Sequence, residues 1–161
     1  MAKKKINIRL LPGGTVPEKQ NGNWYDCTTR KLSKMKLGRD MEMEVSSTEG
    51  IVQVNPGDIL ISYLGFATDL GKGYEAQLKP RSSTFKKYGL LQGNAVGLID
   101  DSYCGNNDEW MVYWYCTRSV RIPVNARLCQ MTIEKSNPEV EFNLVEDLGN
   151  EDRGGFGTTG K

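Results

Sequence analysis

The strongest chemical signal in the sequence lies between Pro80 and Gly105, in the stretch PRSSTFKKYGLLQGNAVGLIDDSYCG. Arg81 is followed directly by Ser82 and Ser83, so a planar guanidinium fork and two hydroxyls are available to the oxygens of a phosphate group. An ordinary turn that carries a surface arginine would have the same residues. The triplet therefore indicates either a phosphorylated ligand or a plain turn.

Two carboxylates follow the apolar segment 96–99 in the same stretch. Asp100 and Asp101 stand where we expect a strand to end, and a carboxylate held there can orient or deprotonate a water molecule. The same pair is typical of an Asx turn that opens a hairpin. Both interpretations place a carboxylate at the edge of a rigid element.

The last nine residues, RGGFGTTGK from Arg153 to Lys161, form a glycine-rich cationic tail. Glycines allow consecutive backbone N–H groups to converge on one anion, and Arg153 adds a fixed charge. Phe156 has no structural reason to stand in this polar run unless it stacks on a ligand. By composition alone, the tail is more typical of a disordered terminus.

The chain is nearly neutral, with 21 Lys and Arg against 20 Asp and Glu among 161 residues. This balance argues against a dominant nucleic-acid or membrane surface, and we interpret Lys3, Lys4 and Lys5 as a solvated start of the chain. No apolar run is long enough for a membrane span, and residues 1–11 lack the features of a signal peptide. We therefore expect a cytoplasmic protein that binds neither nucleic acid nor membrane.

The sequence contains no histidine, which excludes Ser-His and Cys-His nucleophilic pairs and imidazole metal ligands. Cys27, Cys104, Cys116 and Cys129 lack C-x-x-C spacing, so we expect free thiols and neither a zinc site nor disulfides. Acid–base chemistry would have to use carboxylate, lysine, tyrosine or thiol groups.

Short apolar segments separated by turn residues must position these groups. They predict one all-β domain over residues 1–150, a sandwich, jelly roll or barrel, followed by a flexible arm over 151–161. The expected strands are 6–11, 51–54, 59–66, 74–78, 95–99, 110–116, 120–122, 127–133 and 140–145, with one helical turn over 83–88.

Two segments have no clear chemistry of their own. Residues 110–116 are apolar or aromatic on both faces of the expected strand, which indicates that one face meets another subunit. Residues 30–50 show neither helical nor strand periodicity, and we interpret them as a surface hairpin or insertion.

Four separated motifs of this chain resemble those of the trimeric all-β dUTP diphosphatases (dUTPases). They occur in the family's order over residues 52–161: PRSS, GNAVGLIDDSYCG, RLCQM, and EFNLVED followed by DRGGFGTTG. The resemblance implies a jelly-roll-like β-sandwich or barrel with a mobile C-terminal arm. It also implies hydrolysis of dUTP to dUMP and pyrophosphate with Mg²⁺, by a homotrimer whose three active sites lie between subunits.

The resemblance also assigns roles to single residues. It implies that Asp100 binds the deoxyribose 3′-hydroxyl and activates water, and that Asp26 holds a magnesium-bound water. The implied phosphate contacts are Arg81, Ser82, Ser83, Arg127 and Gln130, with Gln130 also near the attacking water. The implied uracil and sugar hairpin comprises Asn94, Gly97, Ile99 and Tyr103, and the implied closing arm comprises Arg153, Phe156, Gly157, Thr158 and Thr159.

The chain departs from the family pattern at four places. Residues 23–27, NWYDC, stand for the first motif, but only Asp26 matches it and Trp24 replaces a usual glycine. Residues 30–50 make the link to Pro56 longer than is typical, Ser102 replaces a second aspartate, and the tail is two residues short before Phe156. Two alternatives stay open at this point. One is a dCTP deaminase of similar fold, and the other is a nucleotide-binding regulatory protein that uses residues 30–50 for a protein partner.

Overall fold

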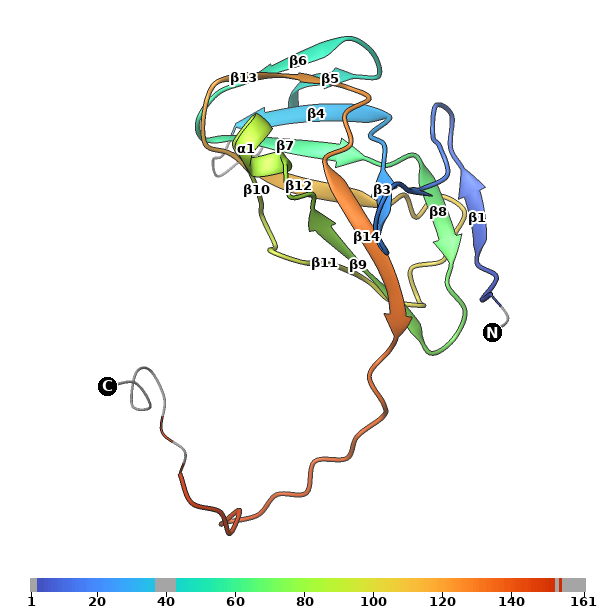
Figure 1. Ribbon diagram of the computed structural model, residues 1–161, viewed down its shortest axis with the longest axis vertical. Coiled ribbons are helices and arrows are strands. Elements are labelled where there is room, and N and C mark those ends of the chain that lie inside the picture. Colours follow the sequence, from blue (N-terminus) through green and yellow to red (C-terminus); the bar gives the residue numbers. More distant parts are fainter. Residues whose placement is uncertain (1–2, 37–42, 153, 155–161) are drawn as a thin grey trace.

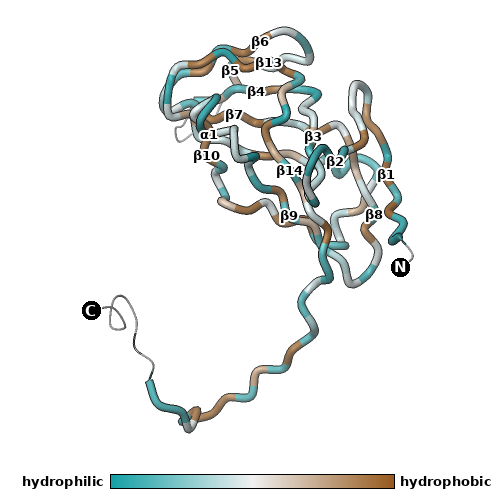
Figure 2. Tube along the Cα trace, in the orientation of Figure 1, coloured by the Kyte–Doolittle hydropathy of each residue, from teal (hydrophilic) through white to brown (hydrophobic). Residues whose placement is uncertain are grey.

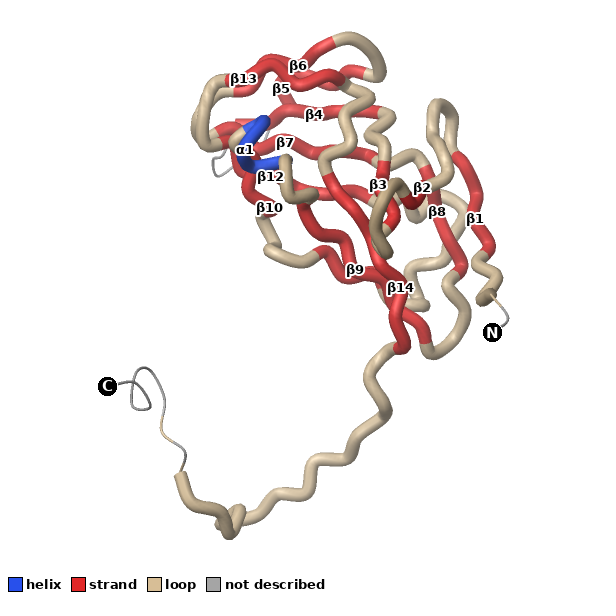
Figure 3. The backbone as a smooth tube through the Cα atoms, in the orientation of Figure 1, coloured by secondary structure: helices blue, strands red, loops and turns tan. Residues whose placement is uncertain are grey.

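The computed structural model describes residues 3–36, 43–152 and 154, and these contain fourteen strands and one short helix (Figures 1 and 3). The strands are β1 (Asn7–Leu10), β2 (Glu18–Lys19), β3 (Tyr25–Cys27), β4 (Lys31–Lys36), β5 (Met43–Ser47), β6 (Ile51–Val54), β7 (Asp58–Tyr63), β8 (Phe66–Asp69), β9 (Tyr74–Pro80), β10 (Leu90–Gln92), β11 (Gly97–Ile99), β12 (Met111–Cys116), β13 (Val120–Pro123) and β14 (Cys129–Lys135). The helix α1 (Thr84–Tyr88) coincides with the expected helical turn.

Two antiparallel five-stranded sheets form the body of the molecule (Figure 1). One has the strand order β10-β12-β7-β4-β5 and the other the order β11-β9-β14-β3-β2. Two-stranded ribbons, β1-β8 and β13-β6, accompany them. The arrangement confirms the predicted all-β, jelly-roll-like class.

The core lies between the sheets and follows the period-2 alternation of a strand. In β12, Val112, Trp114 and Cys116 are buried, whereas Tyr113 and Tyr115 point outward and are 43% and 39% exposed. The buried indole of Trp114 donates a hydrogen bond of 2.8 Å to Ser62 Oγ, so its one polar group is satisfied. The outward face of β12 thus carries two exposed tyrosines, and the contact of this face with another subunit stays a prediction.

The segment 30–50 forms a hairpin, but the prediction that it lies at the surface is wrong for its first strand. β4 pairs with β7 on one side and with β5 on the other, and Leu32 and Ser33 are fully buried. Alternating lysines, such as Lys34, which pairs with Glu44, conceal the apolar face in the sequence. β4 is therefore part of the core, and β5 is the edge strand.

The predicted strand 140–145 is also wrong. Residues 136–152 contain no strand and run away from the body after β14, as Figure 1 shows. Apolar and polar residues alternate along this segment in Figure 2, yet Phe142 and Leu144 are 93% and 98% exposed. A strand needs a neighbouring strand for its backbone hydrogen bonds, and within one chain this segment has none.

The structure also bears on the expectations about cysteines and membrane spans. The four cysteines are free, with Cys27, Cys116 and Cys129 buried and Cys104 exposed. Within the part of the chain that the structure describes, no helix is long and apolar enough to cross a membrane.

Candidate functional site

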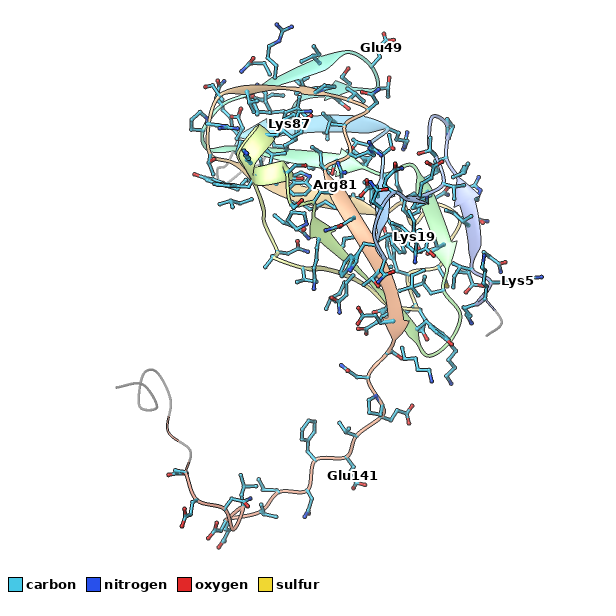
Figure 4. All side chains as sticks on the ribbon, in the orientation of Figure 1. Lys5, Lys19, Glu49, Arg81, Lys87 and Glu141 are labelled. Atoms are coloured by element: carbon cyan, nitrogen blue, oxygen red, sulfur yellow. The ribbon has the colours of Figure 1, made fainter. Side chains whose placement is uncertain are left out.

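The first group of predicted residues gathers around Asp26, at the end of β9 where Arg81 leaves the sheet. Figure 4 labels Arg81 at this corner of the molecule. Register places Gln130 of β14 between Asp26 of β3 and Lys79 of β9. Arg81 Nε contacts Asp26 Oδ1 at 2.9 Å, and Arg127 Nη1 lies 3.6 Å from Asp26 Oδ2. Three adjacent strands thus bring two guanidinium groups, an amide and a carboxylate together.

The backbone of this corner fixes the same side chains. Gln130 Nε2 donates to the carbonyl of Pro80 at 3.1 Å, and Arg81 Nη1 donates to the carbonyl of Arg127 at 3.4 Å. The Arg81 amide donates to the carbonyl of Leu128 at 3.2 Å. Because these partners are backbone groups of β9 and of the segment that leads into β14, Arg81 and Gln130 are held in place before any ligand binds.

A cavity of about 250 Å³ opens beside this cluster. It is lined by Gln20, Asn21, Gly22, Asn23, Trp24, Asp26, Arg81, Ser82 and Gln130. The altered first motif therefore forms part of the wall, where Lys79 Nζ lies 5.3 Å from the centre of the Trp24 ring. Arg127 lines an adjoining cavity of about 320 Å³ that shares Gln20 and Asp26. Ser83 lies outside this lining, at the N-cap position of α1.

The two carboxylate oxygens of Asp26 differ in their contacts, because Oδ2 has the Arg127 charge nearby but accepts no hydrogen bond. Its side chain is 9% exposed, Oδ1 bonds Arg81, and Oδ2 is buried without a hydrogen-bond partner. No group of three or more acidic, cysteine or histidine side chains in the described residues could hold a metal ion by itself. Mg²⁺ commonly keeps several waters and takes one or two carboxylates together with substrate phosphates. Asp26 suits contact with such an ion through a water molecule.

The second group of predicted residues lies in the turn after β11. Asp100 Oδ1 accepts hydrogen bonds from the amide of Ser102 at 2.9 Å and from its hydroxyl at 2.5 Å. These bonds favour the charged carboxylate and lower the pKa of Asp100. Asp101 is used differently, because its Oδ2 accepts the amide of Gly73 at 2.9 Å. Asp100 is thus the carboxylate left accessible to a ligand.

A cavity of about 330 Å³ adjoins Asp100. It is lined by Leu98, Ile99, Asp100, Ser102, Tyr103, Glu109 and Met111. The Tyr103 hydroxyl donates to the carbonyl of Glu109 at 3.2 Å, and burial raises the pKa of Tyr103.

Two predicted hairpin residues do not line this cavity. A Cβ atom at Gly97 would lie 3.1 Å from Leu78 Cβ, so glycine permits close packing of β11 on β9. Asn94 Oδ1 accepts Gln92 Nε2 at 3.2 Å in the turn before β11.

The structure does not bring the two groups together within one chain. Ile99 pairs with Ala76, whereas Pro80 pairs with Cys129, so the groups occupy opposite ends of β9. Six residues of extended strand separate the level of Asp100 from Arg81, a span of roughly 20 Å. The predicted arm residues Arg153, Phe156 and 157–159 lie outside the described residues.

Sequence reasoning missed the pair of Arg30 and Glu109 beside the second cavity. Arg30 Nε contacts Glu109 Oε1 at 2.6 Å, although the residues are 79 positions apart. No local sequence pattern could have indicated that Arg30 and Glu109 contact each other. Trp24 was interpreted only as a departure from a family motif, whereas the structure places it in the wall of the cavity beside Asp26.

Comparison with known proteins shows the family of the chain. The sequence model of the dUTPase family matches residues 45–160. The SPbeta prophage-derived deoxyuridine 5′-triphosphate nucleotidohydrolase YosS of Bacillus subtilis (strain 168) is 39% identical over 137 residues, which cover 85% of this chain and 94% of that protein.

Solved structures agree on the fold. A variant of the Staphylococcus bacteriophage 80alpha dUTPase with dUpNHpp superposes with a TM-score of 0.71 at 18% identity, covering 99% of this chain and 100% of that one. A variant dUTPase from phage phi11 of S. aureus, solved to show how a structural Mg(II) ion is coordinated, has a TM-score of 0.63 at 18% identity and covers 90% and 99%. The chain therefore belongs to the dUTPase family.

Proposed function

We propose that this protein hydrolyses dUTP to dUMP and pyrophosphate, in a homotrimer whose active sites each combine residues of different copies. The observation that carries the proposal is the cluster of Arg81, Arg127 and Gln130 around Asp26, in a chain 39% identical to a dUTP nucleotidohydrolase. This cluster has the donors that a triphosphate requires.

The cluster binds the phosphates. Arg81 uses Nε on Asp26, which leaves donors of its fork directed to a ligand, and Ser82 adds a hydroxyl at the same cavity. Ser83 supplies a further hydroxyl from the start of α1. Charge develops on the phosphate oxygens during transfer, and donors fixed in advance stabilise it without reorganisation.

Asp100 orients the attacking water. Its lowered pKa keeps the carboxylate ionised at neutral pH, so it accepts a hydrogen bond from water and aims a lone pair at the α-phosphorus. A carboxylate of low pKa is a weak base, so its contribution is mainly the position of the water for in-line attack. Gln130 donates to the same region from the phosphate side.

Bound Mg²⁺ would neutralise charge on the triphosphate and polarise its phosphorus–oxygen bonds. Asp26 would hold that ion only through a water molecule, because its free Oδ2 is one acceptor and Oδ1 is committed to Arg81. Removal of one arginine partner would therefore disturb the phosphate and metal contacts together.

The hairpin selects the nucleoside. The Asn94–Ile99 backbone reads the uracil edge, and cytosine would leave polar groups unpaired at a cost of about 1–3 kcal/mol per mismatch. Tyr103 packs against the sugar at the cavity wall, and Asp100 meets the 3′-hydroxyl. Phe156 closes the site over the base, with Arg153 and residues 157–159 on the phosphates.

Two observations support the homotrimer. The groups around Arg81 and Asp100 lie at opposite ends of β9, so a site that contains both requires a second copy. The segment 136–152 that leads to the arm also carries apolar side chains with no cover in its own chain, Phe142 and Leu144 above all. Large exposed side chains of this kind indicate a partner surface.

The test is pyrophosphate release from dUTP with Mg²⁺ by the purified protein. We expect turnover by the natural chain and a loss of about 10²–10⁴-fold in kcat for Asp100→Asn, which keeps the shape of the side chain. Absence of pyrophosphate from dUTP would overturn the proposal. Ammonia release from dCTP would establish the deaminase instead.

A further inference from the structure

A mostly buried ion pair lies directly behind the hairpin cavity. The Glu109 carboxylate contacts both Arg30 Nε, at 2.6 Å, and Arg30 Nη2, and its Oε1 also accepts the amide of Gly65 at 2.8 Å. The side chains of Arg30 and Glu109 are 18% and 11% exposed. A bidentate pair of this kind fixes the direction of both side chains.

The backbone around the pair leaves it no room to shift. A Cβ atom at Gly14 would lie 1.8 Å from the carbonyl oxygen of Gly65, and one at Gly65 would lie 2.9 Å from Arg30 Cδ. The Leu11 amide donates to the Gly65 carbonyl at 2.9 Å. Arg30, directly before β4, and the β7–β8 corner therefore hold the Glu109 carboxylate, and the N-terminal loop packs against that corner from its other side.

The fixed position of Glu109 affects the cavity through its backbone carbonyl. Its carbonyl accepts the Tyr103 hydroxyl at 3.2 Å, and both residues line the cavity beside Asp100. Tyr103 stands in a loop, so the direction of its ring depends on where that acceptor is held. When the Glu109 carbonyl is fixed, the Tyr103 ring is held at one place in the wall of the cavity.

We propose that the Arg30–Glu109 pair is a positioning element that holds the Tyr103 ring against the sugar and thereby sets the preference for deoxyribose over ribose. This inference rests on the function proposed above. Neither side chain performs chemistry on the substrate. The pair acts through Tyr103, because a ring free to swing by about 1 Å makes room for a 2′-hydroxyl and weakens contact with the correct sugar.

Kinetic comparison of dUTP with UTP tests the inference. Arg30→Met removes the fork at similar length, Glu109→Gln keeps the shape but not the charge, and Tyr103→Phe removes only the hydroxyl. Arg121→Met is the matched control, because Arg121 is an exposed arginine on β13. For each variant, kcat and KM are measured for both nucleotides, together with the melting temperature.

We expect Arg30→Met to lower the ratio of kcat/KM for dUTP to that for UTP by about tenfold or more, mainly through KM. Tyr103→Phe should lower the ratio in the same direction with little change in melting temperature, and Arg121→Met should leave it unchanged. A lower melting temperature with an unchanged ratio for Arg30→Met would overturn the inference. If Arg30→Met does not fold, an unchanged ratio in both Glu109→Gln and Tyr103→Phe would overturn it.

A second readout separates this inference from the proposed function. The Tyr103 ring, assigned by comparison with Tyr103→Phe, can be titrated by NMR without any substrate. Burial is the main cause of its raised pKa, and the charges of Asp108 and Glu109 add to it. Because Glu109→Gln removes one of these charges directly, the decisive variant is Arg30→Met, in which greater exposure of a released ring should return the pKa toward the ordinary value. An unchanged or higher Tyr103 pKa in Arg30→Met would count against positioning even if dUTP proved not to be the substrate.

Discussion

The two ends of β9 hold their functional side chains by different means. At the Arg81 end, the side chains stand on or beside three paired strands, and strand register sets their spacing. At the Asp100 end, the side chains stand in a loop that is fixed by turn hydrogen bonds and by the pair of Arg30 and Glu109. The Arg81 end, which we propose to bind the phosphates (the phosphate end), is fixed by the sheet, whereas the Asp100 end, which we propose to bind the sugar (the sugar end), depends on a few specific contacts.

The two aspartates show the same contrast. Asp26 is 9% exposed between two arginines, so it serves chiefly to aim Arg81 and Arg127. Asp100 is exposed, and its partners are Ser102 and the backbone of its own turn. A buried carboxylate beside cations organises a site, and an accessible one remains free to meet a ligand.

The largest expected effect on activity comes from two variants, each of which lacks the functional group at one end of β9. Arg81→Ala should lower kcat/KM by about 10²–10³-fold and Asp100→Asn by about 10²–10⁴-fold, because each removes a group fixed for the transition state. Co-refolding the two inactive variants in equal amounts should restore about one quarter of the natural activity, since sites with both natural groups form at random between copies.

Steady-state pyrophosphate release checks this recovery. Each variant refolded alone serves as the control, and mixing without refolding should restore nothing. Activity of the co-refolded mixture that equals the sum of its parts would show that each site uses only one chain.

A smaller effect should follow from loosening the support of the sugar end. Gly14→Ala places a Cβ where the Gly65 carbonyl lies, so the backbone must shift, at a cost of about 1–3 kcal/mol in the free energy of unfolding. Denaturant unfolding measures this change. Gly22→Ala is the control, since a Cβ there meets nothing within 4 Å. Equal stability of the two variants would contradict the tight fit behind Glu109.

The pH profile offers a subtler comparison. Ser102 lowers the pKa of Asp100, so activity that needs the carboxylate is kept above this lowered value and lost as pH falls through it. Ser102→Ala should raise that pKa and move the acid limb of kcat/KM to higher pH. Ser119→Ala removes an exposed serine hydroxyl elsewhere and should leave the limb in place. An identical limb in all three proteins would exclude Asp100 as the titrating group.

The smallest effect concerns thiol reactivity at the two ends. Cys27 and Cys129 form a buried register pair beside the phosphate cluster, and their mutual contact and burial raise the pKa of Cys27. Cys116 is also buried, with its pKa raised to about 12, whereas Cys104 is exposed next to Tyr103.

A disulfide reagent followed by absorbance should therefore modify one thiol rapidly in the native protein and all four after denaturation. Cys104→Ser should abolish the rapid phase. A rapid phase that persists in this variant would show that the phosphate end opens readily.

The sequence allowed the fold class to be predicted because most strands carry local signals. The segments 51–54, 74–78 and 110–116 have short apolar patterns bounded by turn residues, and each contributes to a strand. The pattern failed for β4, where lysines hide a core strand, and for 140–145, where an apolar segment has no partner in its own chain. Pairing with distant segments decides both cases.

The same division holds for the site. Types and spacing of residues sufficed to predict Arg81 with Ser82 and Asp100 as candidates, because local motifs carry the chemistry, whereas Gln130 was predicted only from the resemblance to the dUTPase family. Tertiary structure alone decided that Asp26 aims Arg81, that Asp100 lies at the far end of β9, and that Arg30 holds Glu109. These facts depend on strand register and on contacts between residues many positions apart, and no local pattern in a sequence specifies either.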